Sequence, residues 1–167
     1  MNEALARQAI QTFMMNNSTY FTQLATVHGE AREITQYATS KFAYPRDYPF
    51  VRIVCNRADA VTQSSNAWKP KTIYSMDVMV ADMALGQQGD STPYEEIDMD
   101  FRVICDRMVG KILDEKKFCS GGQCFSLMTD GDVISKENVD AMMVGEDDSV
   151  EALMLGSSIT FDLEECK

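Results

Sequence analysis

The stretch TIYSMDVMVADM, residues 72–83, decides the fold class of this 167-residue chain. Its more apolar positions recur at every second residue, at Tyr74, Met76, Val78 and Val80. Successive side chains of a β-strand point to opposite faces, so this period of two places the four on one face. The positions between them include Ser75 and Asp77. The stretch therefore predicts a strand of a sheet with one face turned to a core.

A long amphipathic helix is expected after this strand. Thr92 and Glu95 form a capping box, and Pro93 occupies the first helical position, where proline is favoured. One apolar stripe follows, made of Ile97, Phe101, Ile104, Met108 and Ile112. We expect this helix over about residues 93–116, with Gly121 or Gly122 terminating it.

A second amphipathic helix is expected near the N-terminal end of the chain, over about residues 3–15. Its apolar stripe consists of Leu5, Ala6, Ala9, Ile10, Phe13 and Met14. Asn2 is the expected N-cap, because its side-chain oxygen can accept a free backbone N–H. Asn16 and Asn17 are expected to end the helix.

The remaining apolar segments read as strands. Before the long helix they are PFVRIVC (residues 49–55) and a short RADAVTQ (57–63). After the helix two strands are expected, in a region that contains the apolar segments QCFSLMT (123–129), DVISKENVDAMMV (132–144) and ALMLGSSITFDLEEC (152–166). Gly156 is expected to mark a bulge in the last of these. The sequence thus predicts a single α+β domain over residues 1–167. Its mixed, mainly antiparallel sheet would carry both main helices packed on one face.

The net charge of −11 is unevenly distributed. Residues 41–71 carry six basic and two acidic residues, whereas residues 72–167 carry seven basic and 21 acidic residues. An acidic chain is poorly suited to sequence-independent binding of DNA phosphates. The acids either form a solvated surface, which charge alone favours, or meet the basic segment of a neighbouring subunit. The second reading gives a candidate subunit interface, made of Arg46, Arg52, Arg57, Lys69, Lys71, Glu146, Asp147 and Asp148.

The five cysteines are odd in number and scattered, which favours a reducing compartment over a disulfide framework. Cys119 and Cys124 lie close in sequence, and whether they pair is left open. No second Cys/His pair stands at the spacing of a zinc site, so none is expected. No apolar run is long enough to cross a bilayer, and the first 15 residues lack a signal-peptide pattern. We therefore expect synthesis in the cytoplasm and no membrane partner.

Few residues suggest catalysis. His28 is the single histidine and stands beside a glycine, and no nucleophile-elbow motif accompanies it. The glycines of GQQGDST lack the Gly-Lys-Ser/Thr of a phosphate-binding loop. The carboxylates of YEEIDMD suit the start of a helix better than acid–base chemistry. No catalytic residue, cofactor or metal is expected.

The stretch TDGDVISKE, residues 129–137, resembles the second half of a calcium-binding loop. Asp130, Gly131 and Glu137 stand at suitable spacing, but Ser126 and Met128 occupy the first and third positions, where acids belong. We favour a turn closed by Asp130 and Gly131. Whether residues 130–137 bind any ion is left open.

Four features follow one another along the chain: YPRDYPFVRIV, TIYSMDVMVADM with its Val80-Ala81-Asp82, the helix EEIDMDFRVICDRMVGKIL and the late strand SSITFDLEEC. In these features and in the order of its elements, the chain resembles small ring-forming proteins of tailed bacteriophages, namely tail-terminator and neck (head–tail connector) proteins, including those of crAss-like phages. A glycine-tryptophan pair before the last strand and a proline after the final cysteine are absent.

The resemblance implies a structural subunit of the virion, made in the host cytoplasm, without catalytic activity. Copies would assemble head to tail into a ring at the head–tail junction, with double-stranded DNA passing through the opening. The partners would be other copies and neighbouring neck, portal or tail proteins, without sequence-specific nucleic-acid binding. The competing interpretation is a small cytosolic enzyme or acidic regulatory binding module, and an acidic mimic of DNA is a third.

Overall fold

The computed structural model describes residues 2–22, 33–43, 45, 48–61, 71–85, 92–128, 134–144 and 150–166. Within these ranges, the side chains of residues 84, 85, 92–96, 142–144, 150 and 151 lie outside the description. The helices are α1 (Glu3–Asn16), α2 (Ser18–Thr22) and α3 (Thr92–Glu115). The strands are β1 (Gln36–Ala38), β2 (Phe50–Val61), β3 (Lys71–Leu85), β4 (Lys117–Ser120), β5 (Gln123–Leu127), β6 (Ile134–Asn138), β7 (Ala141–Val144) and β8 (Val150–Glu165).

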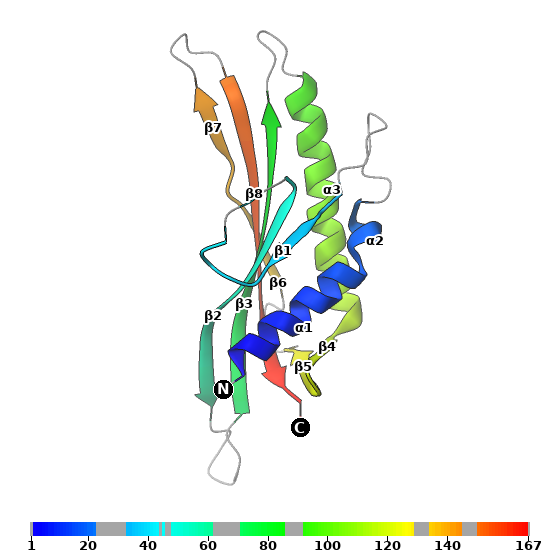
Figure 1. Ribbon diagram of the computed structural model, residues 1–167, viewed down its shortest axis with the longest axis vertical. Helices are drawn as coiled ribbons and strands as arrows, with labels where there is room; N and C mark the ends of the chain where they lie inside the picture. Colours follow the sequence, from blue (N-terminus) through cyan, green and yellow to red (C-terminus); the bar gives the residue numbers. More distant parts are fainter. Residues whose placement is uncertain are drawn as a thin grey trace.

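The eight strands form one curled sheet, in which six follow the order β1-β2-β3-β8-β5-β4 and the other two, β6 and β7, each pair with β8 (Figure 1). β1 runs parallel to β2, and the other pairs are antiparallel. One edge of β8 pairs with β3, whereas its other edge pairs in turn with β7, β6 and β5. The expected α+β class with a mixed, mainly antiparallel sheet is therefore confirmed.

The strands bury alternate residues, as the period of two predicts. The buried positions are Val51 and Ile53 on β2, Tyr74, Met76, Val78 and Val80 on β3, and Leu155, Ile159, Phe161 and Leu163 on β8. We call this side of the sheet the inner face. They form one hydrophobic cluster with Ala6, Ile10, Phe13 and Met14 of α1 and Phe101, Ile104, Met108 and Ile112 of α3. The intervening side chains, among them Arg52, Ser75, Asp77, Met79 and Thr160, lie on what we call the outer face.

Both main helices lie close to their expected bounds, but their ends differ from the prediction. Asn2 makes no side-chain cap to α1; its Nδ2 instead donates to Glu165 Oε1 at 3.0 Å. At the other end of α1, Asn17 Nδ2 donates to the Phe13 carbonyl at 2.8 Å, as a terminating asparagine should. α3 begins at Thr92, and its capping box stays a prediction because those side chains lie outside the description.

The prediction that Gly121 or Gly122 terminates α3 is wrong. The helix ends at Glu115, and Lys116 follows in the left-handed region with φ of 59°. Gly121 and Gly122, with φ of 58° and 80°, instead form the two-residue turn between β4 and β5. Positive φ at both central positions is what a tight type I′ hairpin turn requires, and glycine adopts it without a Cβ clash.

Two strand predictions also need correction. Residues 50–61 form the one strand β2 where two were expected, with a register shift between Cys55 and Arg57. At Gly156 no bulge occurs, since the β3–β8 register runs unbroken from Ile73↔Glu164 to Leu85↔Ala152. A Cβ at Gly156 would lie 2.7 Å from Val139 Cγ2 and 2.8 Å from the Val139 carbonyl oxygen. This glycine therefore permits the close approach of a neighbouring strand.

The calcium-loop window begins and ends in β-strand conformation. Ser126 lies on β5 opposite Glu164, and Glu137 lies on β6 opposite Ser158. Met128 N–H donates to the Asp162 carbonyl at 3.0 Å, continuing the pairing of β5 with β8. This backbone differs from the continuous loop of an EF-hand, while residues 129–133, including the expected turn at Asp130 and Gly131, lie outside the description.

Candidate interaction groove

A groove of about 460 Å³ lies on the outer face of the sheet. It is lined by Lys41, Phe42, Ala43, Pro45, Tyr48, Phe50, Arg52, Met79, Val80, Ala81, Val139, Met154, Leu155 and Gly156. We call it the outer-face groove. Its lining is mostly apolar, with the cationic groups of Lys41 and Arg52 as exceptions. Apolar concave surfaces with a few placed polar groups are the usual form of binding sites.

The floor of the outer-face groove follows from strand register. Phe50 on β2 pairs with Ala81 on β3, and Ala81 pairs with Gly156 on β8. Ala81 and Gly156 carry the smallest side chains possible, so the sheet surface is low at this row. Met79 and Met154 stand in nearby rows and rise on either side. Methionine is flexible and polarizable, which suits a surface that adapts to a partner.

One wall of the groove is the short turn around residues 41–43. Arg52 Nη1 donates to the Lys41 carbonyl at 3.0 Å, and Ala43 N–H donates to the Ser40 carbonyl at 3.1 Å. Phe42 lies in this turn with 76% of its surface exposed. A large apolar side chain so exposed in a hydrogen-bonded turn is a candidate contact point for another molecule.

The opposite wall is Val139, the residue between β6 and β7. Its side chain is 47% exposed and lies over Gly156, and its N–H donates to the Gly156 carbonyl at 3.0 Å. In a regular sheet the Gly156 N–H would donate to a backbone carbonyl of the neighbouring strand. Here the side chain of the next residue, Asp140, takes the place of that carbonyl. Asp140 Oδ1 accepts the Gly156 N–H at 3.1 Å.

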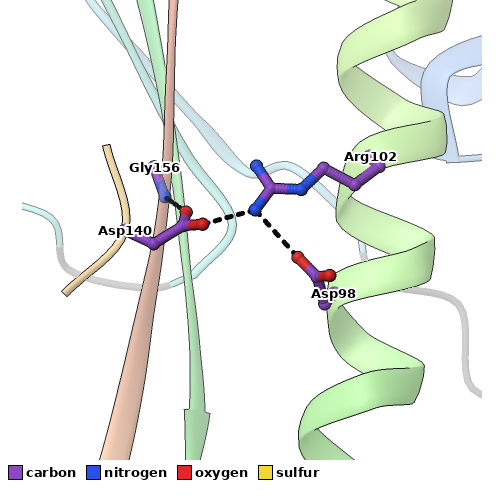
Figure 2. A network of polar contacts seen from close by, with 4 residues as sticks. All are labelled: Asp98, Arg102, Asp140 and Gly156. Atoms are coloured by element: carbon purple, nitrogen blue, oxygen red, sulfur yellow. Dashed lines mark hydrogen bonds and ion pairs between the residues drawn. The ribbon is translucent and has the colours of Figure 1, made fainter. Parts of the chain in front are cut away.

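Figure 2 shows how this wall is tied to α3. Arg102 Nη2 lies 2.5 Å from Asp140 Oδ2 and 3.0 Å from Asp98 Oδ1, one helical turn away. A second ion pair joins Lys136 on β6 to Asp106 on α3. These partly exposed pairs fix the position of the 136–140 segment against the helix, and with it one side of the groove.

The structure describes three of the eight residues predicted for a subunit interface. Arg52 lines the outer-face groove and also contacts Met79 Sδ. Arg57 pairs with Asp59 of the same strand at 2.6 Å, and Lys71 pairs with Glu164 on β8. The predicted basic cluster is therefore partly used within the chain. Arg46, Lys69, Glu146, Asp147 and Asp148 lie outside the described residues.

The most apolar parts of the groove were missed by the sequence prediction. Phe42, Val139 and Gly156 come from separate segments, and pairing along β8 brings the last two together. The one local signal is the run FAYPRDYP, residues 42–49, where an aromatic precedes a proline-rich connection. By pattern alone, its tyrosines and prolines indicate only the approach to a strand.

The described residues contain no cluster of three or more His, Cys, Asp or Glu side chains that could hold a metal ion. Burial raises the pKa of the Cys105 thiol to about 12, so this cysteine is a protonated core residue at neutral pH. Asp98 is engaged by Arg102, and Asp100 is buried. His28 lies outside the described residues.

Cys119 and Cys124 form a disulfide between the paired strands β4 and β5. They stand directly opposite each other, one residue from the ends of the Gly121–Gly122 turn on each side. Cys55, Cys105 and Cys166 are free thiols. The pairing that the sequence left open is thus present.

No protein-family model matches this sequence, and no curated protein is significantly similar to it. One solved structure, whose name states no function, aligns with 100% of this chain and 97% of its own at 15% identity and a TM-score of 0.46. A likeness this weak carries no argument about function. No helix among the described residues is long and apolar enough to span a membrane.

Proposed function

We propose that this chain is a ring-forming structural subunit of a tailed-bacteriophage virion, at the neck or tail terminator, with DNA passing through the ring. Copies contact one another head to tail, so that different surfaces of neighbouring subunits meet. The chain has no catalytic role in this proposal. Its further partners are the adjacent portal, neck or tail proteins.

The observation that carries the proposal is the outer-face groove with the exposed Phe42 and Val139 on its walls. Both are large apolar side chains that the chain itself leaves partly in water, which costs free energy unless another surface covers them. A groove between two such side chains suits a contact with a second protein chain. Aromatic residues are common at the centres of such contacts.

Charge supports the same proposal. Lys41 and Arg52 line the groove, and the segment after residue 71 carries 21 acidic against seven basic residues. A cationic groove on one copy and acidic segments on the next are complementary, which favours association and sets its orientation. The excess of acid also leaves a DNA-facing surface without phosphate affinity.

The proposal includes a finer view of the fold, with α1 and α3 packed on the same face of the sheet. It is supported by the single hydrophobic cluster that residues of both helices share with Met76, Val78 and Ile159 of the inner face. Helices on one side would leave the outer face of the sheet available to neighbouring subunits.

Native mass spectrometry and negative-stain electron microscopy test the proposal directly. The purified chain is measured over a salt series, alone and together with portal and neck proteins encoded nearby. The expected result is a closed ring of one stoichiometry that Phe42→Ser weakens at least tenfold. Met15→Ser, which alters an exposed residue of α1, is the control and should assemble normally. Monomers in every sample, with and without partners, would overturn the proposal.

A regulatory binding module is the second candidate, favoured by the groove's combination of an apolar lining with Lys41 and Arg52. Such a site suits an elongated apolar molecule that ends in a carboxylate or phosphate. A fluorescent fatty acid is a suitable probe. Saturable binding that Arg52→Gln weakens, in a chain that stays monomeric with all partners, would favour the module over the ring.

A further inference from the structure

Three cysteines stand in one row across neighbouring strands. Cys119 on β4 pairs with Cys124 on β5. The next pairing follows from the β5–β8 register, in which Phe125 lies opposite Glu165 and Cys166 N–H donates to the Cys124 carbonyl at 2.8 Å. Directly paired residues of antiparallel strands project their side chains to the same face. All three sulfur atoms therefore lie on one side of the sheet, with Cys124 in the middle.

The third cysteine is positioned as a thiol beside the disulfide. Cys166 Sγ lies 2.7 Å from Ser126 Oγ, whose residue is two positions along β5 from Cys124 and therefore on the same face. Cys166 is partly exposed, and Cys119 is exposed, so water and base reach the row. The Cys166 N–H donates to the Cys124 carbonyl at 2.8 Å, and the Cys166 carbonyl accepts from Gln123 Nε2 at 3.0 Å. Residues at such a position in a regular antiparallel sheet have a Cα separation of about 5.5 Å. This is the commonest separation for a disulfide.

We propose that the Cys119, Cys124 and Cys166 row is a site of intramolecular thiol–disulfide exchange. Cys166 loses its proton to water, and its thiolate attacks Cys124 Sγ. A Cys124–Cys166 bond forms while the Cys119–Cys124 bond breaks, and Cys119 leaves as a thiolate that takes a proton from water. The step conserves electrons, and it requires no external oxidant because one disulfide replaces another.

The order of the strands favours this reaction. β5 lies between β4 and β8, so the attacking sulfur of Cys166 and the leaving sulfur of Cys119 are on opposite sides of Cys124. Exchange proceeds through an attack on one particular disulfide sulfur, and here only Cys124 adjoins the free thiol. The other free thiols lie elsewhere, since Cys55 is on β2 and Cys105 is buried in α3.

The exchange changes which parts of the sheet are covalently joined. The first disulfide closes only the β4–β5 hairpin, a loop of sequence separation 5. The second joins β5 to the residue that follows β8, the central strand. The C-terminal end of β8 is held by hydrogen bonds in one form and by a covalent bond in the other. This device is independent of ring formation.

Disulfide mapping after alkylation of the free thiols tests the proposal in the wild-type chain. The oxidised protein is held without added thiol at about pH 8.5, where a free cysteine is half ionised. It is then acid-quenched, alkylated, digested without reduction and analysed by mass spectrometry. We expect Cys124–Cys166 peptides together with alkylated Cys119, in a ratio that becomes constant with time. Alkylation of Cys166 alone in the row, with Cys119 never labelled, would overturn the proposal.

Serine variants give a second measurement. Cys119→Ser, oxidised with glutathione disulfide, should form the Cys124–Cys166 bond, and Cys166→Ser should form only Cys119–Cys124. Cys55→Ser is the matched control and should give the wild-type pattern, since it alters a thiol outside the row. Two free thiols at Cys124 and Cys166 in folded Cys119→Ser, checked by circular dichroism, would contradict the proposed geometry.

Discussion

The inner and outer faces of the β3–β8 pair are built by the same two strands but differ in how far their side chains are buried. On the inner face, Tyr74 and Val78 are fully buried beneath other parts of the chain. On the outer face, Ser158 Oγ donates to Asp77 Oδ1 at 2.7 Å, and both side chains stay in partial contact with water. Among the described residues, the inner face therefore lies in the hydrophobic core, whereas the outer face keeps side chains in contact with water.

This difference separates the residues that hold the fold from those available to another molecule. Inner-face side chains contribute stability through burial, at about 25 cal/mol per Å² of apolar surface. The outer face carries polar contacts, the ion pair of Lys71 with Glu164, and the outer-face groove. Substitutions on the inner face should therefore change folding, and substitution of the exposed groove side chain Phe42 should change association.

The largest effect is expected from Ile159→Ala on the inner face of β8. Ile159 is fully buried, so truncation leaves a cavity and should lower the free energy of unfolding by about 2–5 kcal/mol. Its neighbour Thr160 projects from the outer face, and Thr160→Ala should change stability by less than about 0.5 kcal/mol. Urea unfolding followed by circular dichroism measures both. Equal losses would contradict the assignment of faces.

Alanine substitutions at two separate glycines, Gly156 and Gly110, are expected to give the next largest changes in stability. Gly156→Ala forces a Cβ to within 2.8 Å of the Val139 carbonyl oxygen, which should cost about 1–3 kcal/mol of unfolding free energy. Gly110 lies inside α3, and a methyl group added there would meet nothing within 4 Å, so Gly110→Ala should stabilise by about 0.5–1 kcal/mol. In thermal unfolding, we expect Gly156→Ala to lower the midpoint temperature and Gly110→Ala to raise it. Stabilisation by both would show that Val139 and β8 do not approach as described.

Substitutions in the contact between α3 and the groove wall should change the free energy of unfolding by less. Asp140→Ala removes the acceptor for the Gly156 N–H and one of the two carboxylate partners of Arg102, and should cost about 1–2 kcal/mol. Asp140→Asn keeps one oxygen acceptor for the Gly156 N–H but places an NH2 group where Oδ2 faces Arg102, so the ion pair alone is lost and we expect a loss below about 1 kcal/mol. Unfolding in low and high salt distinguishes the two contributions. Wild-type stability of Asp140→Ala would show that the network does not hold this wall.

The elements that the sequence predicts well are long and strongly periodic. α1, α3 and β3 differ from their expected bounds by at most two residues at either end, because their apolar spacing is uninterrupted. The β4–β5 hairpin was missed because its two glycines follow a helix and resemble a helix terminator. Only the register of β4 with β5 shows that the two glycines form a hairpin turn and do not terminate the helix.

The groove could not be predicted for a different reason. Its floor depends on the pairing of Ala81 with Gly156, residues 75 positions apart in a sequence that carries no local signal for their contact. Arg52 was predicted for an interface on charge alone, and its contact with the Lys41 carbonyl depends on how the preceding loop folds back. The sequence shows which residues are charged. Strand register and the path of the loop determine which of them lie together on the surface.

Substitution of Phe42 is expected to affect folding as little as Thr160→Ala does. With 76% of its surface exposed, Phe42→Ser should change the free energy of unfolding by less than about 0.5 kcal/mol. A larger loss in urea unfolding would show that Phe42 serves the fold of its own chain. Phe42→Ser should thus weaken association and leave stability unchanged, whereas Ile159→Ala should lower stability.

The central claim, that the outer-face groove contacts a neighbouring copy, is tested most directly by photo-crosslinking from residue 42. Phe42 is replaced by p-benzoylphenylalanine, and Met15, exposed on α1, receives the same group as a control. Both proteins are irradiated alone and with portal and neck proteins, and crosslinked peptides are identified by mass spectrometry. We predict crosslinks from position 42 to a second copy of the chain. The same low yield from positions 42 and 15 in every sample would contradict the account.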